Sequence, residues 1–197
     1  MKVIVNDLKC YNNKKLNNAL SQVLLKFSES LIHKLEIKSD DSLCINIVPE
    51  EEFSNIVGLN KCRFMAVSDE KGIFCKPYDS GLMEYFRILK HEIVHLLLLK
   101  NKNTLLDWIH EGCAVFFSNQ IYILDKQVKQ NKVLNIKYLA QNFLNNRECY
   151  FYSAIYIKFL YERHKNLFFK LLDNEIELQD FEIDAIEYFN SLTNRNI

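Results

Sequence analysis

The sequence has few chain breakers and no excess of charge of either sign. Only 4 of its 197 residues are glycine and 2 are proline, so few positions force a turn and long regular elements are expected. The 25 basic and 25 acidic residues cancel, which removes the electrostatic argument for a nucleic-acid or anionic-membrane partner. A hydrophobic share of 49% argues against a disordered chain.

Long apolar runs and cysteine pairs are also missing. The aliphatic run Leu96–Leu99 is far too short to cross a membrane, and residues 1–7 turn polar too soon for a secretory signal. Six cysteines are scattered without a Cys-x-x-Cys pair: Cys10, Cys44, Cys62, Cys75, Cys113 and Cys149. We therefore expect reduced, mostly buried thiols in a cytoplasmic protein with no membrane partner.

The N-terminal part carries strand patterns. Apolar and polar residues alternate over Leu43–Val48 until Pro49 stops the pattern. A turn signal at residues 69–72 predicts a hairpin. The segments expected to be strands are 2–5, 43–48, 63–67 and 72–75.

Helical patterns dominate the rest of the chain. An apolar stripe predicts a helix over Leu16–Ile37, and Asp79–Gly81 has the chemistry of a helix start. Everything after about Asp107 is expected to be mainly helical, ending with a helix at Phe181–Leu192.

These patterns predict an α+β fold with a small N-terminal mixed sheet, helices around it and a mainly helical C-terminal part. A chain of 197 residues is expected to form one domain, spanning residues 1–197. Within it, residues 1–80 form the sheet-rich part, and residues 81–197 hold the helices that carry the candidate site.

That candidate site begins at residues 91–95, which read His-Glu-Ile-Val-His in an apolar, helix-compatible stretch. On a helix, His91 and His95 lie about one turn apart on the same face, so both imidazoles can bind one metal ion. Glu92 lies close enough to that face to act on a metal-activated water rather than to bind the metal. The motif therefore predicts a metal site that activates water.

A third ligand is expected from Asp107–Ala114, which also has a helical pattern. Zinc in a hydrolase normally has three protein ligands and one open position, and Glu111 is the natural candidate. Neighbouring residues on a helix point about 100° apart, so Glu111 and His110 cannot easily bind the same ion, and His110 remains the alternative ligand. Cys113 would approach the metal only if Glu111 were displaced.

The motif at residues 91–95 and the sequence Trp-Ile-His-Glu-Gly-Cys-Ala at residues 108–114 together resemble the gluzincin metallopeptidases, in particular the peptidase MA-like group. In that family a Trp-x-x-Glu-Gly-x-Ala segment supplies the third ligand from a "glutamate helix". The resemblance implies a zincin-like fold and a Zn²⁺ ion bound by His91, His95 and Glu111. It also implies a zinc-dependent peptidase that hydrolyses peptide or protein substrates, with Glu92 as the general base.

The resemblance covers about residues 73–165 and implies two further roles. Family members often carry a tyrosine shortly before a helix, where its phenol can stabilise an oxyanion. Tyr150 fits that place and Tyr152 is the alternative. The family also binds the substrate backbone along an edge strand, for which Gly72–Lys76 is the candidate. An ordinary strand with a covered edge is the alternative interpretation of that segment.

The sequence departs from the family pattern after Glu111. Family members often place an acidic residue three or four positions later, where it orients a metal-binding histidine, whereas Ala114 and Val115 occupy these positions. The orienting partner would then be Asp107, Glu84 or a backbone carbonyl.

Because of this departure, the alternative function is a catalytically weak or inactive zincin-like module that binds or regulates a partner. A tail such as Phe181–Ile197 could also block the site and keep the enzyme latent. A narrower alternative is the small intracellular peptidase group that cleaves transcriptional repressors, whose third-ligand segment typically lacks Trp-x-x-Glu-Gly.

Overall fold

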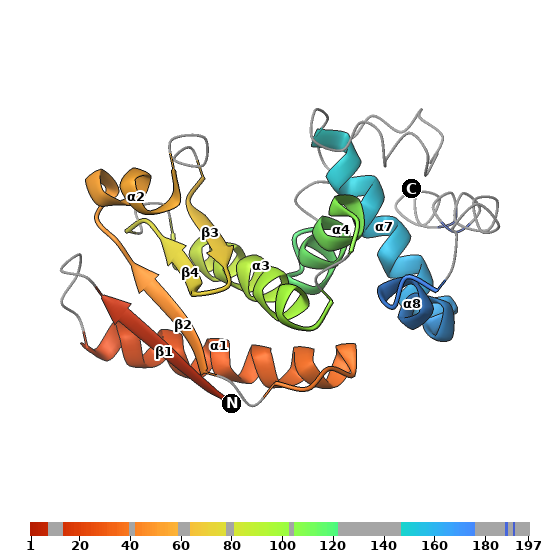
Figure 1. The fold of residues 1–197 in the computed structure, drawn as a ribbon, viewed down its shortest axis with the longest axis horizontal. Coiled ribbons are helices and arrows are strands. Elements are labelled where there is room, and N and C mark those ends of the chain that lie inside the picture. The colour runs from red at the N-terminus through yellow and green to blue at the C-terminus, as the bar shows by residue number, and fades with distance from the viewer. Residues whose placement is uncertain are drawn as a thin grey trace. The chain divides into compact units, whose positions relative to one another are not determined.

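The computed structural model describes residues 1–7, 14–39, 42–58, 64–77, 81–102, 105–121, 147–175, 188 and 191. These residues form one four-stranded sheet and six helices, which confirms the predicted α+β class (Figure 1). The chain divides into two compact units, Met1–Asn101 and Lys102–Ile197, which are described in turn. Among the helices of the described part, none is long and apolar enough to cross a membrane. The expectation of a single domain stays a prediction.

The first unit contains the mixed sheet, with strand order β1-β2-β4-β3. Its strands are β1 (Lys2–Asp7), β2 (Ser42–Ile47), β3 (Ala66–Asp69) and β4 (Gly72–Cys75). β2 pairs in parallel with β1 and with β4, whereas β3 and β4 form the predicted antiparallel hairpin. All four strands begin or end within three residues of their predicted bounds.

The position of β4 corrects one expectation. Residues 72–76 were the candidate edge strand, but β4 lies between β2 and β3, which confirms the alternative of an ordinary strand with covered edges. The edge strands of the described sheet are β1 and β3. The parallel pairing of Ile45 with Ile73 holds β4 inside the sheet. Gly72 permits this close pairing, since a Cβ atom there would lie 2.5 Å from the carbonyl oxygen of Cys44.

The alternation in the strands separates a buried face from a half-buried face. Leu43, Ile45 and Ile47 of β2 are completely buried, whereas Cys44 and Asn46 between them are half-buried. Each residue contributes to the face opposite that of its neighbours, as in any strand. The pattern that predicted β2 therefore also determines which of its side chains enter the core.

Two long helices complete the core of the first unit. α1 (Lys14–Leu35) packs on β1, α3 (Leu82–Asn101) packs on β3 and β4, and the two helices pack on each other. The short helix α2 (Glu50–Val57) contacts β4 and buries Phe53. The buried residues of α1 keep the predicted helical spacing and are Leu20, Leu24, Leu31 and Leu35.

Three helices end in the same way, and this follows from the scarcity of glycine. A left-handed residue ends α1, α4 (Asp107–Phe117) and α8 (Lys165–Leu172), and these residues are Glu36, Asn119 and Asn174. At each end the next N–H donates to a carbonyl five residues earlier, as from Ile37 to Ile32 over 3.2 Å. This is the Schellman arrangement, in which glycine is the usual left-handed residue. It ends α1 two residues before the predicted Ile37.

The second unit is helical where it is described. α4 packs closely on α7 (Arg147–Arg163), and α7 packs on α8. Gly112 lies at the contact between α4 and α7, where a Cβ atom would be 2.8 Å from the Ser153 carbonyl oxygen. The helical prediction after Asp107 is confirmed for these three helices. The helix expected at Phe181–Leu192 lies outside the described residues, apart from positions 188 and 191.

The cysteines agree with the expectation of free thiols where the structure describes them. Cys75, Cys113 and Cys149 are buried and Cys44 is half-buried, and none of the four forms a disulfide. Cys10 and Cys62 lie outside the described residues.

Candidate metal-binding residues

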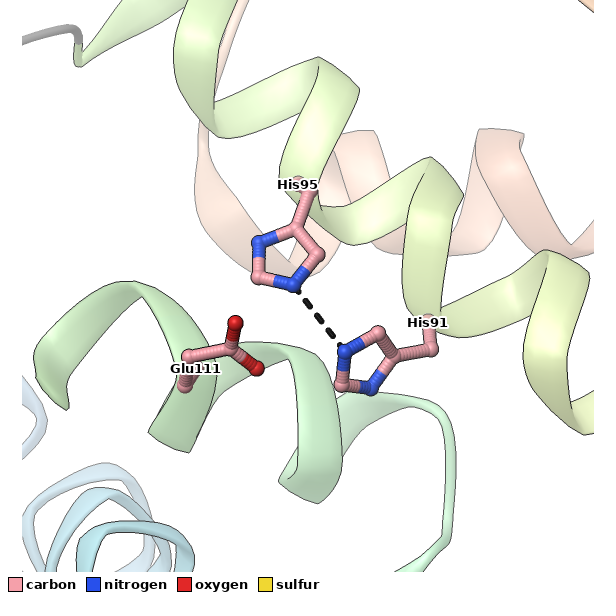
Figure 2. Close-up of side chains that lie close together, drawn as sticks. All are labelled: His91, His95 and Glu111. Atoms are coloured by element: carbon pink, nitrogen blue, oxygen red, sulfur yellow. Dashed lines mark hydrogen bonds between the residues drawn. The ribbon is translucent and has the colours of Figure 1, made fainter. Parts of the chain in front are cut away.

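The two histidines of the predicted motif meet on one face of α3. The Nε2 atoms of His91 and His95 are 3.0 Å apart, and the two rings meet edge to face with centroids separated by 4.6 Å (Figure 2). Both side chains are half-buried. The helix geometry expected from the sequence is therefore present, with the two Nε2 atoms within hydrogen-bonding distance of each other.

The separation of the two nitrogens fits shared ligation of a metal. Two nitrogen ligands of a tetrahedral zinc ion, each bonded at about 2.05 Å, lie about 3.3 Å apart. The observed 3.0 Å differs from this value by less than the movement that a small ring rotation supplies. The residues present thus fit the metal that the motif implies.

The rest of α3 holds this face in place. Leu89 and Ile93 are completely buried in the first unit, and Leu96 and Leu97 are at most 1% exposed. These side chains pack in the core formed with α1 and the sheet. A helix anchored along its length by large buried residues has little freedom to turn about its own axis, so the direction in which the face with the two imidazoles points is well defined within the first unit.

Glu92 lies beside His91 on α3 but has a partner on the sheet. The Ser68 hydroxyl donates a hydrogen bond of 2.8 Å to Glu92 Oε2. Both side chains are half-buried. An ionised carboxylate only accepts hydrogen bonds, so the hydroxyl must be the donor. This contact joins the predicted general base to the edge strand β3.

Glu111, the predicted third ligand, belongs to α4 in the second unit, and Figure 2 draws it on that helix. Its side chain is half-buried, whereas Trp108 and Gly112 on the same helix are buried. Trp108 meets the ring of Tyr156 on α7 edge to face, with centroids 5.9 Å apart. The tryptophan and glycine of the Trp-x-x-Glu-Gly segment therefore fix α4 against α7, and so position Glu111 within its unit.

The alternative ligands on α4 differ in their surroundings. His110 is half-buried, like its neighbour Glu111. Cys113 is completely buried, and burial raises the pKa of its thiol. Metals bind the thiolate form of cysteine, which this burial disfavours. The assignment of Glu111 rather than Cys113 therefore agrees with the local chemistry of α4.

The two candidate tyrosines both lie in α7 rather than before it. Tyr150 is half-buried in the first turns of the helix, whereas Tyr152 is buried and packs against the ring of Phe151 at 5.8 Å. The sequence placed Tyr150 just ahead of a helix, and the helix in fact begins at Arg147. Tyr150 is the more exposed of the two phenols.

Two carboxylates were proposed as partners that orient the histidines, Glu84 and Asp107, and both are exposed. Glu84 on α3 accepts a hydrogen bond from Arg87 over 3.3 Å and is exposed, so it is engaged with a neighbour on its own helix. Asp107 is exposed in the first turn of α4. Ala114 and Val115, which replace the acidic residue of the family pattern, are buried.

Ser68 is a hydrogen-bond partner of the candidate site that the sequence did not reveal. A single serine in a strand has no spacing signature, and its partner Glu92 lies 24 residues away in the sequence. The sequence feature that could have indicated it is its place in β3, two residues after the buried Ala66, because alternate residues of a strand point to the same face. Ser68 therefore points to the face covered by α3, but only the packing of the helix shows which residue it contacts.

Comparison with known proteins adds no relative. No family model, curated protein or solved structure matches this chain.

Proposed function

We propose that the chain is a zinc-dependent metallopeptidase of the gluzincin type, with a zincin-like catalytic arrangement. The observation that carries the proposal is the pair of Nε2 atoms, from His91 and His95, held 3.0 Å apart on one face of α3. With Glu111 these residues offer two imidazole nitrogens and a carboxylate oxygen, a donor set that could hold a metal ion. Two histidines with one glutamate is a common ligand set of catalytic zinc.

Glu92 is proposed as the general base. When bound, a zinc ion lowers the pKa of a water ligand to about 7 and polarises a carbonyl group. The Glu92 carboxylate accepts a proton from the attacking water and later delivers it to the leaving amine. Its Oε2 atom accepts the Ser68 hydrogen bond, so Oε1 is the oxygen that takes the proton.

A tyrosine is proposed to stabilise the oxyanion that forms when the amide is attacked. Tyr150 is the first choice, because it is half-buried whereas Tyr152 is buried, and a phenol that stabilises the oxyanion must reach the substrate. Tyr152 remains the alternative, although it is 95% buried. Tyr150→Phe should lower kcat, whereas Tyr152→Phe should change mainly stability. The opposite pattern would assign the role to Tyr152.

The substrate backbone is proposed to add to β3, in place of the strand expected from the sequence. The Lys76 N–H donates to the Met65 carbonyl over 2.9 Å, so these residues form a hydrogen-bonded pair of the hairpin. Such pairs alternate in an antiparallel ladder, so the backbone groups of Ala66 and Ser68 point away from β4. An extended peptide could therefore form backbone hydrogen bonds along this edge.

The second candidate function is a zincin-like binding or regulatory module with weak or no turnover. The observation that favours it is the pair of buried apolar residues, Ala114 and Val115, where family members often carry an acid.

The C-terminal tail, which was proposed to block the site and keep an enzyme latent, contacts α7 through Tyr188. Tyr188 packs on Phe159 of α7 at 5.3 Å and donates a hydrogen bond of 2.8 Å to Glu162.

A peptide library distinguishes the two functions. Zinc-loaded wild-type chain should cleave a subset of peptides, and a chain truncated before residue 181 should do the same or more. The control is Glu92→Gln, which preserves the shape of the side chain but removes the base. Cleavage that survives undiminished in Glu92→Gln would show that Glu92 is not the base. No cleavage by either the full or the truncated zinc-loaded chain would favour the binding module.

The remaining expectations stand as proposals. Peptides or proteins are the proposed substrates, and the cytoplasm, where thiols stay reduced, is the proposed location.

A further inference from the structure

The position of Ser68 in β3 directs its side chain toward the core. Ser68 pairs with Ile73, and Ala66 pairs with Cys75 in the same hairpin. Ile73 and Cys75 are completely buried, and residues paired across two strands share one face of the sheet. Since α3 packs on β3, a side chain on this face can reach the helix that carries the histidines.

The contact that results is specific in its chemistry. The Ser68 hydroxyl has one proton, and its 2.8 Å hydrogen bond uses that proton on Glu92 Oε2. A hydrogen bond to an ionised acceptor is shorter and about twice as strong as one between neutral groups. We propose that Ser68 is a positioning residue that fixes the carboxylate of Glu92, a role that rests on the proposed function of Glu92 as the base.

The physical reason is that a glutamate side chain has several rotatable bonds. Without a second fixed point its carboxylate samples several orientations, and only some of them place an oxygen where water is to be deprotonated. The Ser68 hydroxyl ties down Oε2 and leaves Oε1 for the proton. Because β3 and α3 are both regular elements of one packed unit, the position of this anchor is itself fixed.

A purely structural role for the serine is the competing explanation. In that case the hydroxyl would satisfy a half-buried carboxylate and stabilise the hairpin against α3, and its loss would lower stability without a selective effect on turnover. The two roles differ in kcat, because only a positioning role changes kcat while KM and bound metal stay the same.

Three variants separate these roles in the full, zinc-loaded chain. Ser68→Ala should keep wild-type zinc content and KM and lose about 10- to 100-fold in kcat, the usual effect of removing a group that orients a catalytic one. Ser68→Thr keeps the hydroxyl and suits a strand, so it should restore most of kcat. Ser42→Ala, at an exposed position of β2, is the matched control and should behave like wild type.

A second readout does not depend on activity. The unfolding of wild type, Ser68→Ala, Glu92→Ala and the double variant is measured in denaturant, with the chains freed of metal by a chelator. If the hydrogen bond forms, the double variant loses less stability than the two single variants together, because both remove the same interaction. Strictly additive losses would show that Ser68 and Glu92 do not interact, and would overturn the inference.

The failures of the inference and of the proposed function are distinguishable. If zinc-loaded wild type cleaves peptides but Ser68→Ala has an unchanged kcat, the positioning role is wrong and the peptidase stands. The same conclusion follows if Ser68→Thr or Ser42→Ala loses as much kcat as Ser68→Ala. If wild type cleaves nothing, the peptidase proposal falls and the positioning role falls with it. If the stability losses of Ser68→Ala and Glu92→Ala are non-additive in that case, the hydrogen bond between Ser68 and Glu92 exists but is a structural contact only.

Discussion

Gly112 of α4 and Ser153 of α7 approach so closely that a methyl group at position 112 would lie 2.8 Å from the Ser153 carbonyl oxygen. A second atom, Cγ1 of Ile157, would be 2.9 Å away. Real Cβ atoms do not tolerate such distances from backbone, so one helix must shift if the glycine is replaced. The glycine that follows the proposed ligand Glu111 thus determines how closely α4 packs on α7.

Gly112→Ala should therefore destabilise the chain by about 1–3 kcal/mol, the usual cost of overpacking a core. Alanine is otherwise the better helix former by about 0.5–1 kcal/mol, so a clash must be the cause of any loss. Leu106→Ala is a suitable control, since Leu106 precedes the same helix and is 56% exposed. Denaturant unfolding measures both. A Gly112→Ala chain as stable as wild type would contradict the close packing.

Glu92→Gln should bind zinc like wild type and lose at least about a hundred-fold in kcat, because the amide cannot accept the proton of the attacking water. Zinc stoichiometry and steady-state cleavage of a selected peptide measure the two effects. Glu29→Gln is the control, as Glu29 is an exposed glutamate of α1 with no proposed role in the site. Wild-type turnover in Glu92→Gln would remove Glu92 from the mechanism.

The choice between Glu111 and His110 as third ligand can be decided by zinc affinity. Removing a group that only orients a ligand costs about 10- to 100-fold in metal affinity, so loss of a true ligand should cost at least as much. Glu111→Ala should therefore weaken zinc binding by more than about a hundred-fold, whereas His110→Ala should retain it. Competition with a chromogenic chelator measures both. The reverse order would make His110 the ligand.

Low pH should lower the stability of the second unit, because it protonates Glu162. Burial opposes the ionisation of Glu162, but hydrogen bonds from Lys158 and Tyr188 outweigh that effect and lower its pKa. A lowered pKa stabilises the folded state fully above the ordinary glutamate pKa of about 4.3, and this contribution is lost as pH falls through the lower folded value. The side chain is 42% exposed, so solvent screening limits the contribution to about 0.5 kcal/mol.

The corresponding measurement is unfolding at several pH values between 3 and 7. Glu162→Gln should remove part of the acid sensitivity, whereas Glu175→Gln, at an exposed position after α8, should not. An identical acid dependence in wild type and Glu162→Gln would show that this cluster contributes nothing to it.

Local patterns in the sequence predicted the elements but not their arrangement. The alternation of Leu43, Ile45 and Ile47 predicted β2, and the same residues are completely buried. Strand order depends on pairing between distant segments, and no local pattern showed that β4 pairs with β2. For this reason the sequence left open whether residues 72–76 formed an edge strand or an ordinary covered one, and the structure shows the second.

In the candidate site, too, the sequence predicted the local geometry but not the contacts between distant segments. One-turn spacing on a helix was enough to predict that His91 and His95 meet, since helix geometry is local. The contact between Ser68 and Glu92 joins a strand to a helix, so it depends on packing that spacing cannot express. The end of α1 was also placed two residues too late, because a left-handed Glu36 ends that helix.

The most direct test of the central claim is metal content, measured by elemental mass spectrometry on chain purified without chelator. We predict one zinc ion per wild-type chain, and none in His95→Ala. The control variant His33→Ala, which changes an exposed histidine of α1, should keep its zinc. A wild type that stays empty when zinc is supplied, or a His95→Ala chain with full occupancy, would contradict the account.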